Sequence, residues 1–120
     1  MLQSQNKYDL ESRTSQFSKN LIMICRKCTQ DIITSPIINQ LIRSGTSIGA
    51  NYFEANGASS KKDFKNKIFI CKKECRETLY WLQTLASALN SDELKQECRT
   101  LWKEAKELTL IFSKIALNTS

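Results

Sequence analysis

Residues 35–57 read SPIINQLIRSGTSIGANYFEANG, and this stretch decides the fold class. Ser35 and Pro36 predict a helix start, because serine caps helices and proline at the first helical position gives up only an unpaired N–H. Gly57 is a typical residue just after a helix end. Apolar residues between these signals recur at helical spacing, so the stretch predicts a helix from Pro36 to about Asn56.

The rest of the chain predicts three more helices. One runs from about Leu10 to Thr34, with residues 1–8 frayed. Its helically spaced apolar residues are Phe17, Leu21, Ile24, Cys25, Cys28, Ile32 and Ile33.

Two serine caps mark the other helices. Ser60, followed three residues later by Asp63, approximates a capping box and opens a helix that continues to about Leu89. Ser91 caps the last helix, which ends near Leu117. Four helices with short loops predict an all-α fold, an antiparallel up-down-up-down four-helix bundle, as one domain over residues 1–120.

Composition narrows the function. Three glycines and one proline in 120 residues disfavour an all-β fold. The chain has no histidine, which removes the commonest general base and metal ligand, and no glycine-rich phosphate loop. We therefore expect no enzyme activity and no cofactor. The sequence shows no signal peptide and no transmembrane stretch, so we expect a cytoplasmic protein without a membrane partner.

The net charge of +6 favours anionic partners. Residues 59–90 carry seven basic and three acidic residues, which is most of the excess. A step of 100° per residue gathers six basic residues and one aromatic into one helical stripe. This predicted nucleic-acid-binding stripe consists of Lys61, Lys62, Lys65, Phe69, Lys72, Lys73 and Arg76. Phosphates would pair with the cations, and an unpaired base would stack on Phe69. The alternatives are a solvated helix face and an anionic lipid surface.

The helix at residues 36–56 is apolar on most sides, with Arg43 and Glu54 as its only charges. This pattern predicts burial on most sides, which we attribute to a second subunit and hence to a homo-oligomer. A central bundle helix with a few surface apolar residues is the alternative. Small residues favour close approach of another helix; they are Ser44, Gly45, Ser47, Gly49 and Ala50. Ile70 and Trp81 lie off the core stripe and suit an interface, although Trp81 and Trp102 equally suit caps on the core.

Five cysteines in a reducing compartment predict free thiols. Cys25 with Cys28, and Cys71 with Cys75, share helix faces, so a zinc or redox site is conceivable. Both pairs lie on apolar stripes, which favours core packing and no metal.

Three blocks of sequence resemble the bacterial four helix bundle proteins, also called 23S rRNA intervening-sequence proteins. They are RSGTSIGANYFEA at residues 43–55, SSKKDF at 59–64 and ETLYWL at 77–82, and the resemblance covers residues 18–115. It implies a ring-like homopentamer without established enzyme activity. The family is similar to accessory proteins of diversity-generating retroelements, which bind nucleic acid and a reverse transcriptase.

The signature blocks suggest structural roles for six residues, with Arg43 paired to Glu77: Arg43, Ser47, Asn51, Glu54, Glu77 and Trp81. Apolar character adds Tyr52, Phe53 and Ile70 as candidate oligomer-forming residues. Phe53 and Ala55 depart from the family's usual residues. The sequence thus leaves two hypotheses: an oligomer that contacts RNA or DNA through residues 61–76, or a scaffold that binds a protein such as a reverse transcriptase.

Overall fold

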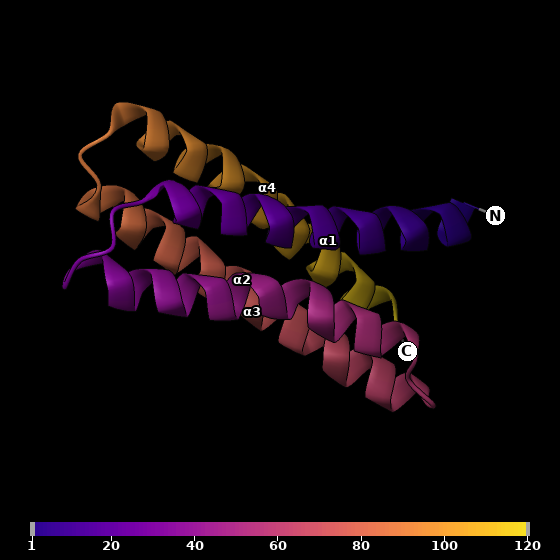
Figure 1. The fold of residues 1–120 in the computed structure, drawn as a ribbon. Helices are drawn as coiled ribbons and strands as arrows, with labels where there is room; N and C mark the ends of the chain where they lie inside the picture. Colours follow the sequence, from indigo (N-terminus) through magenta and orange to yellow (C-terminus); the bar gives the residue numbers. More distant parts are fainter. Residues whose placement is uncertain (1, 120) are drawn as a thin grey trace.

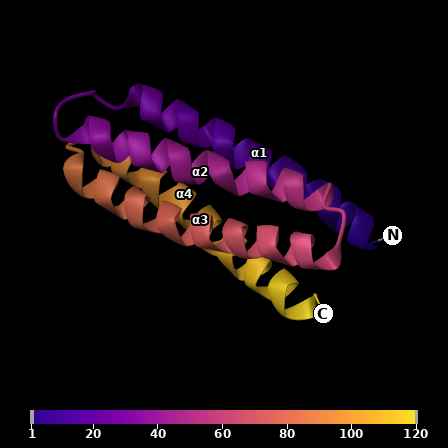
Figure 2. The ribbon, with the colours of Figure 1, turned by 90° about the horizontal axis from the view of Figure 1, so that it is seen from below.

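The computed structural model describes the backbone of residues 2–119 and the side chains of residues 10–119. Its helices are α1 (Leu2–Lys27), α2 (Thr34–Asn56), α3 (Lys61–Ala88) and α4 (Asp92–Asn118). Successive helices run in opposite directions, so α1 starts and α4 ends at the same end of the bundle (Figures 1 and 2). The predicted antiparallel four-helix bundle is confirmed. Fraying of residues 1–8 stays a prediction, because their side chains lie outside the described part.

Each helix packs against two neighbours around a single core. α2 and α3 lie side by side, α3 packs on α4, and α1 closes the bundle against α2 and α4. The largest fully buried side chains come from all four helices and include Phe17, Leu21, Leu41, Ile48, Ile68, Leu82, Leu108 and Phe112. Across this core Tyr52 meets Phe112 edge to face, with ring centroids 5.7 Å apart. None of the described helices is long and apolar enough to cross a membrane.

The first loop differs from the prediction. α1 ends at Lys27 instead of Thr34. Ile32 and Ile33, which were expected on the apolar side of this helix, lie in the loop and are 88% and 60% exposed. The reason is Asp31, whose carboxylate accepts hydrogen bonds from the backbone N–H groups of Ile33 and Thr34, each at 2.9 Å. These two bonds also lower the pKa of Asp31. The first turn of α2 is therefore capped by Asp31, and the predicted Ser35 cap is wrong.

The other helix ends follow the predictions. The Ser60 hydroxyl accepts from the N–H of Asp63 at 3.0 Å, and the Ser91 hydroxyl accepts from the N–H of Leu94 at 3.1 Å. Both bonds satisfy N–H groups that a helix leaves unpaired at its start. α2 ends at Asn56 before Gly57, as expected, although Gly57 keeps a negative φ of −98°.

α2 is buried by its own chain more completely than the sequence suggested. α1 covers one side of it and α3 the other, so that Ile38, Leu41 and Ile48 are buried within one subunit. Close approach of α1 depends on Gly45, where an added Cβ would lie 2.1 Å from a methyl carbon of Leu21. Most apolar side chains of α2 are thus covered by the two flanking helices, whereas Phe53 stays 73% exposed. Oligomer formation itself stays a prediction.

Candidate nucleic-acid interface

The predicted basic stripe lies on the solvent side of α3. Lys61, Lys62, Lys73 and Arg76 are exposed, and Lys65 and Lys72 are half-buried. None of the six forms an ion pair with a carboxylate among the described side chains. From Lys61 to Arg76 the stripe extends about 22 Å at the helical rise of about 1.5 Å per residue. It is therefore a row of unneutralised cations.

An exposed aromatic ring sits in the middle of this row. Phe69 is 48% exposed, and the ammonium of Lys65 lies 6.0 Å from the centre of its ring. Tyr80, 59% exposed, lies further along the same side of α3. Rings in this position offer stacking surfaces between phosphate-binding cations.

α4 extends the basic surface, which the sequence analysis missed. Thr109 marks the side of α4 that faces α3, because its hydroxyl meets the Cys75 thiol. Helical geometry places three basic residues within about 80° of Thr109 around α4. They are Lys95, Arg99 and Lys106, and none forms an ion pair among the described side chains.

The carboxylates of α4 are instead drawn to α1. Arg13 binds Glu104 through two hydrogen bonds of 2.8 Å and contacts Glu107 at 2.9 Å. These carboxylates raise the pKa of Arg13 far above its usual value. Lys27 pairs with Glu97 at 3.0 Å. Three of the five acids of residues 91–120 are therefore held at the contact with α1, away from Lys95, Arg99 and Lys106.

Together the two helices form a basic track, defined as the six α3 residues of the stripe plus Lys95, Arg99 and Lys106. α3 and α4 are antiparallel with Cys75 level with Thr109, so the α4 residues continue the row where the α3 residues end. The track spans about 40 Å by the helical rise, which is close to the 45 Å length of the bundle.

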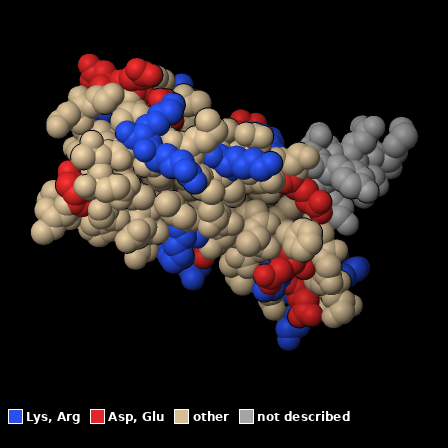
Figure 3. All heavy atoms as spheres, viewed as in Figure 1, with Lys and Arg blue, Asp and Glu red and all other residues tan. Residues whose placement is uncertain are grey.

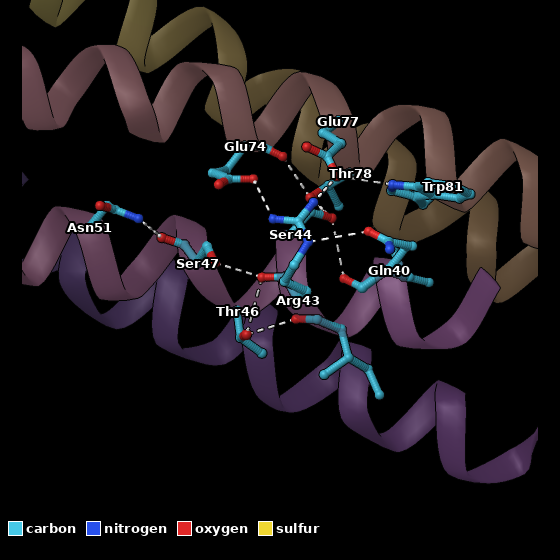
Figure 4. Close-up of polar contacts among 12 residues, drawn as sticks. Gln40, Arg43, Ser44, Thr46, Ser47, Asn51, Glu74, Glu77, Thr78 and Trp81 are labelled. Atoms are coloured by element: carbon cyan, nitrogen blue, oxygen red, sulfur yellow. Dashed lines mark hydrogen bonds and ion pairs between the residues drawn. The ribbon is translucent and has the colours of Figure 1, made fainter. Parts of the chain in front are cut away.

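A second polar arrangement lies where α2 meets α3, and we call it the α2–α3 seam. Figure 4 shows Arg43 reaching from α2 toward two carboxylates of α3. Its guanidinium forms an ion pair with Glu77 and another with Glu74 at 3.4 Å. Trp81 donates its indole N–H to Glu77 at 3.1 Å. The predicted Arg43–Glu77 pair is confirmed, and Glu74, which is 9% exposed, is a partner that the sequence analysis missed.

The other end of the seam is also held by charge. Glu54 accepts from Lys67 at 2.7 Å. Between Arg43 and Glu54, the side chains of Ser47 and Asn51 donate to carbonyl groups of their own helix, at 2.6 and 2.8 Å (Figure 4). The seam thus collects six of the nine residues predicted as structural or oligomer-forming, and Ile70 is half-buried on the same edge of α3.

The two remaining residues of that prediction lie elsewhere. Tyr52 is 4% exposed and belongs to the core. Phe53 is 73% exposed and points away from the seam toward α1. Trp81 packs partly buried against the core, as does Trp102, which agrees with the alternative that they cap it.

A model of the 23S rRNA-intervening sequence protein family matches residues 6–114. The chain belongs to this family. A protein of unknown function from the S23 ribosomal protein family of Bacteroides thetaiotaomicron has a similar crystal structure, with 26% identity and a TM-score of 0.81. The alignment covers 93% of this chain and 98% of that one. Among curated proteins no match is found.

Membership of the 23S rRNA-intervening sequence protein family confirms the resemblance of the three blocks. In the structure these blocks lie on α2 and α3, and two of them meet at the seam. The α4 part of the basic track lies outside them. Placing the residues of α4 at 100° per residue, as was done for α3, would have found this part of the track. It was missed because the net charge of residues 91–120 is zero.

The cysteines are core residues, as predicted. All five are buried and free. Burial raises the pKa of Cys25 and of Cys71 to about 12 and that of Cys98 to about 11, so the reactive thiolate is disfavoured. In the described part of the chain no three His, Cys, Asp or Glu side chains are arranged to hold a metal ion.

Proposed function

We propose that this family member is a non-enzymatic, oligomeric binding protein of the cytoplasm that contacts RNA or DNA through the basic track. The observation that supports this proposal is the separation of charge. Nine basic side chains that form no ion pair among the described side chains share one side of α3 and α4, while three of the five acids of α4 pair with α1. Cations left without protein partners are available to phosphates, and each phosphate contact releases counterions.

The shape of the track favours an extended ligand. It is long and narrow, and Phe69 interrupts the cations near the middle of the α3 row. A strand with unpaired bases can place phosphates on both sides of the ring and stack a base on it. We therefore expect single-stranded nucleic acid to bind more tightly than duplex.

Titration of a labelled single-stranded RNA with salt tests this function. Six phosphate contacts to a single strand predict a slope of log K against log salt of about −4. Changing Lys62, Lys65, Lys72 and Lys73 to glutamate should abolish binding. A control, Lys19→Glu with Arg26→Glu, alters two exposed charges of α1, away from the track, and should leave most of the affinity. Affinity that ignores salt or survives the quadruple change would reject the proposal.

The alternative is a scaffold for a protein partner, such as the reverse transcriptase that the resemblance implies. The uncharged middle of the seam supports it, because half-buried Ile70 and Asn51 lie between two ion pairs. After nuclease treatment, the immobilised chain should then retain a protein that an Ile70→Glu variant loses. Recovery of nucleic acid alone would count against this alternative.

A further inference from the structure

A second exposed ring lies on the same side of α3 as Phe69. Tyr80 follows Phe69 by eleven residues, which is about three turns of an α-helix, so the two residues lie nearly in one line along α3. Tyr80 is 59% exposed and Phe69 is 48% exposed. Their separation along the helix axis is about 16 Å by the helical rise. The basic track therefore contains two aromatic surfaces at a fixed separation.

Tyr80 lies where the α3 cations of the track give way to those of α4. The α3 row ends at Arg76, about one turn before Tyr80. In the antiparallel register of the two helices, Lys106 is level with the turn that contains Tyr80, and Arg99 lies further along. A strand that stacks a base on this ring would therefore find cations for its phosphates on both sides of it.

The ring of Tyr80 is supported by the α2–α3 seam. It meets the ring of Trp81 edge to face, with centroids 4.9 Å apart and ring planes at 82°. Trp81 is itself held, because its indole N–H donates to Glu77 at 3.1 Å and Glu77 forms an ion pair with Arg43 (Figure 4). A side chain that is already ordered loses little conformational entropy when a ligand contacts it. The seam thus prepares Tyr80 for stacking.

The cations between the two rings indicate how many nucleotides separate the stacked bases. Three of them lie on α3 itself: Lys72, Lys73 and Arg76. At the duplex spacing of about 3.4 Å per nucleotide, 16 Å would hold about five nucleotides. A strand whose bases leave their stack to lie on two separate rings is more extended, so fewer nucleotides fit. One phosphate on each of the three cations places the two stacked bases three nucleotides apart.

We propose that Phe69 and Tyr80 select single-stranded nucleic acid that carries two purines three nucleotides apart. This preference rests on the nucleic-acid function proposed for the basic track and adds a sequence pattern to it. Purines present a larger ring surface than pyrimidines, and stacking strength is a common source of modest sequence preference in proteins that bind single strands. Trp81 is a positioning residue, which acts through Tyr80.

Short RNA strands with two adenines in a uridine background test this preference. The adenines are placed from one to five nucleotides apart, and fluorescence anisotropy measures the affinity of the full chain for each strand. Binding should be tightest at a separation of three, by about three-fold or more over adjacent adenines. Adjacent bases cannot reach two rings that lie three helical turns apart.

Leucine variants separate stacking from charge. Phe69→Leu and Tyr80→Leu keep an apolar side chain and all the cations of the track. Each should weaken binding of the strand with three-nucleotide separation about five-fold and remove the optimum. The slope of log K against log salt should stay as in wild type, because the phosphate contacts remain. Tyr80→Phe keeps the ring and should keep the optimum.

The positioning role of Trp81 has its own test. Trp81→Leu removes the ring that supports Tyr80 and should flatten the dependence on adenine separation, while an unchanged salt slope shows that the cations still lie on a folded bundle. Trp81→Phe retains an aromatic neighbour for Tyr80 and should restore part of the optimum.

Phe53 provides a matched control, because it is an exposed ring on the opposite side of the bundle. It is 73% exposed and lines a groove of about 450 Å³ between α1 and α2. Figure 3 views this side, where uncharged surface predominates and basic side chains gather over α1. Phe53→Leu should leave both the optimum and the salt slope unchanged.

Three results would overturn the preference. One is salt-dependent binding that is equally tight at every adenine separation; the nucleic-acid function of the track would then stand without the two stacking positions. Another is an optimum that survives Tyr80→Leu, which would remove this ring from the contact. The third is a chain that binds none of the strands, and this result would also reject the proposed function.

Discussion

The two long faces of the bundle differ in where their charges go. On the α3–α4 face nine basic side chains have no carboxylate partner in the described part of the chain, whereas the α1–α2 face has a groove of small residues with one lysine and one glutamate. The difference arises at the α1–α4 contact, where Arg13 and Lys27 take up three acids of α4. Ion pairing inside the bundle thus leaves one face for anions and the other for apolar contact.

The two faces should differ most in their contribution to RNA binding, which is measured by removing equal charge from each. Arg99→Gln with Lys106→Gln removes two track cations and should weaken RNA binding about ten-fold or more at moderate salt. Lys19→Gln with Arg26→Gln removes the same charge from α1 and should weaken binding less than about two-fold. Fluorescence anisotropy measures both. Equal losses would show that only net charge matters.

Between the faces, the α2–α3 seam should depend on its arginine for stability. Arg43→Ala leaves the nearly buried Glu74 without a cation. We expect a loss of about 2 kcal/mol, less than the roughly 3–5 of a fully buried pair because Arg43 is half-exposed. Urea unfolding measures the loss, and adding Glu74→Gln should recover part of it. An Arg43→Ala protein as stable as wild type would contradict the role of the seam.

The close α1–α2 approach predicts sensitivity to one methyl group. Gly45→Ala would push against buried Leu21, at a cost of about 1–3 kcal/mol, offset by about 1 kcal/mol of helix propensity. The net loss should be at most about 2 kcal/mol in urea unfolding. Gly57→Ala, whose added Cβ has only an ordinary 3.7 Å contact, should be nearly neutral. A stabilising Gly45→Ala change would mean that the two helices separate easily.

The ion pairs between Arg13 and α4 predict that replacing Arg13 affects both stability and RNA binding. Arg13→Gln releases Glu104 and Glu107 from their shared cation. Because the pair is partly exposed, the stability loss should be only about 0.5–1 kcal/mol. RNA binding should weaken slightly as well, since the two carboxylates of α4 lose the cation that neutralises them. Arg13→Lys, which keeps the charge but loses the forked geometry, should affect stability and spare binding.

The buried thiols predict a weak loss of stability in alkali. Their folded pKa values lie above the usual value of about 8.5, so unfolding releases protons once the pH exceeds it. The contribution is complete below pH 8.5 and falls as the pH rises toward about 12, the value for Cys25. The urea midpoint should therefore decline from pH 8 to 9.5. Native thiols should also react slowly with iodoacetamide, and fast reaction would contradict their burial.

Local signals made much of the fold predictable. Ser60 and Ser91 cap α3 and α4 because a hydroxyl and the N–H three residues later are fixed by the chain itself. The core stripe of α3 follows from the 100° step alone. The Asp31 cap escaped prediction, because Ile32 and Ile33 continued the apolar spacing of the preceding helix and an aspartate in a turn is a weaker signal than Ser-Pro.

For the candidate sites, the sequence by itself determined the α3 row of cations, the Arg43–Glu77 pair and the burial of the cysteines. In each case residues on one helix face, or a lone charge in need of a partner, sufficed. Only the tertiary structure decided which acids of α4 are neutralised, that Lys95, Arg99 and Lys106 extend the track, and that Phe53 borders a groove with α1. Those outcomes depend on which helices are neighbours and at what register, and no residue spacing within a single helix contains that information.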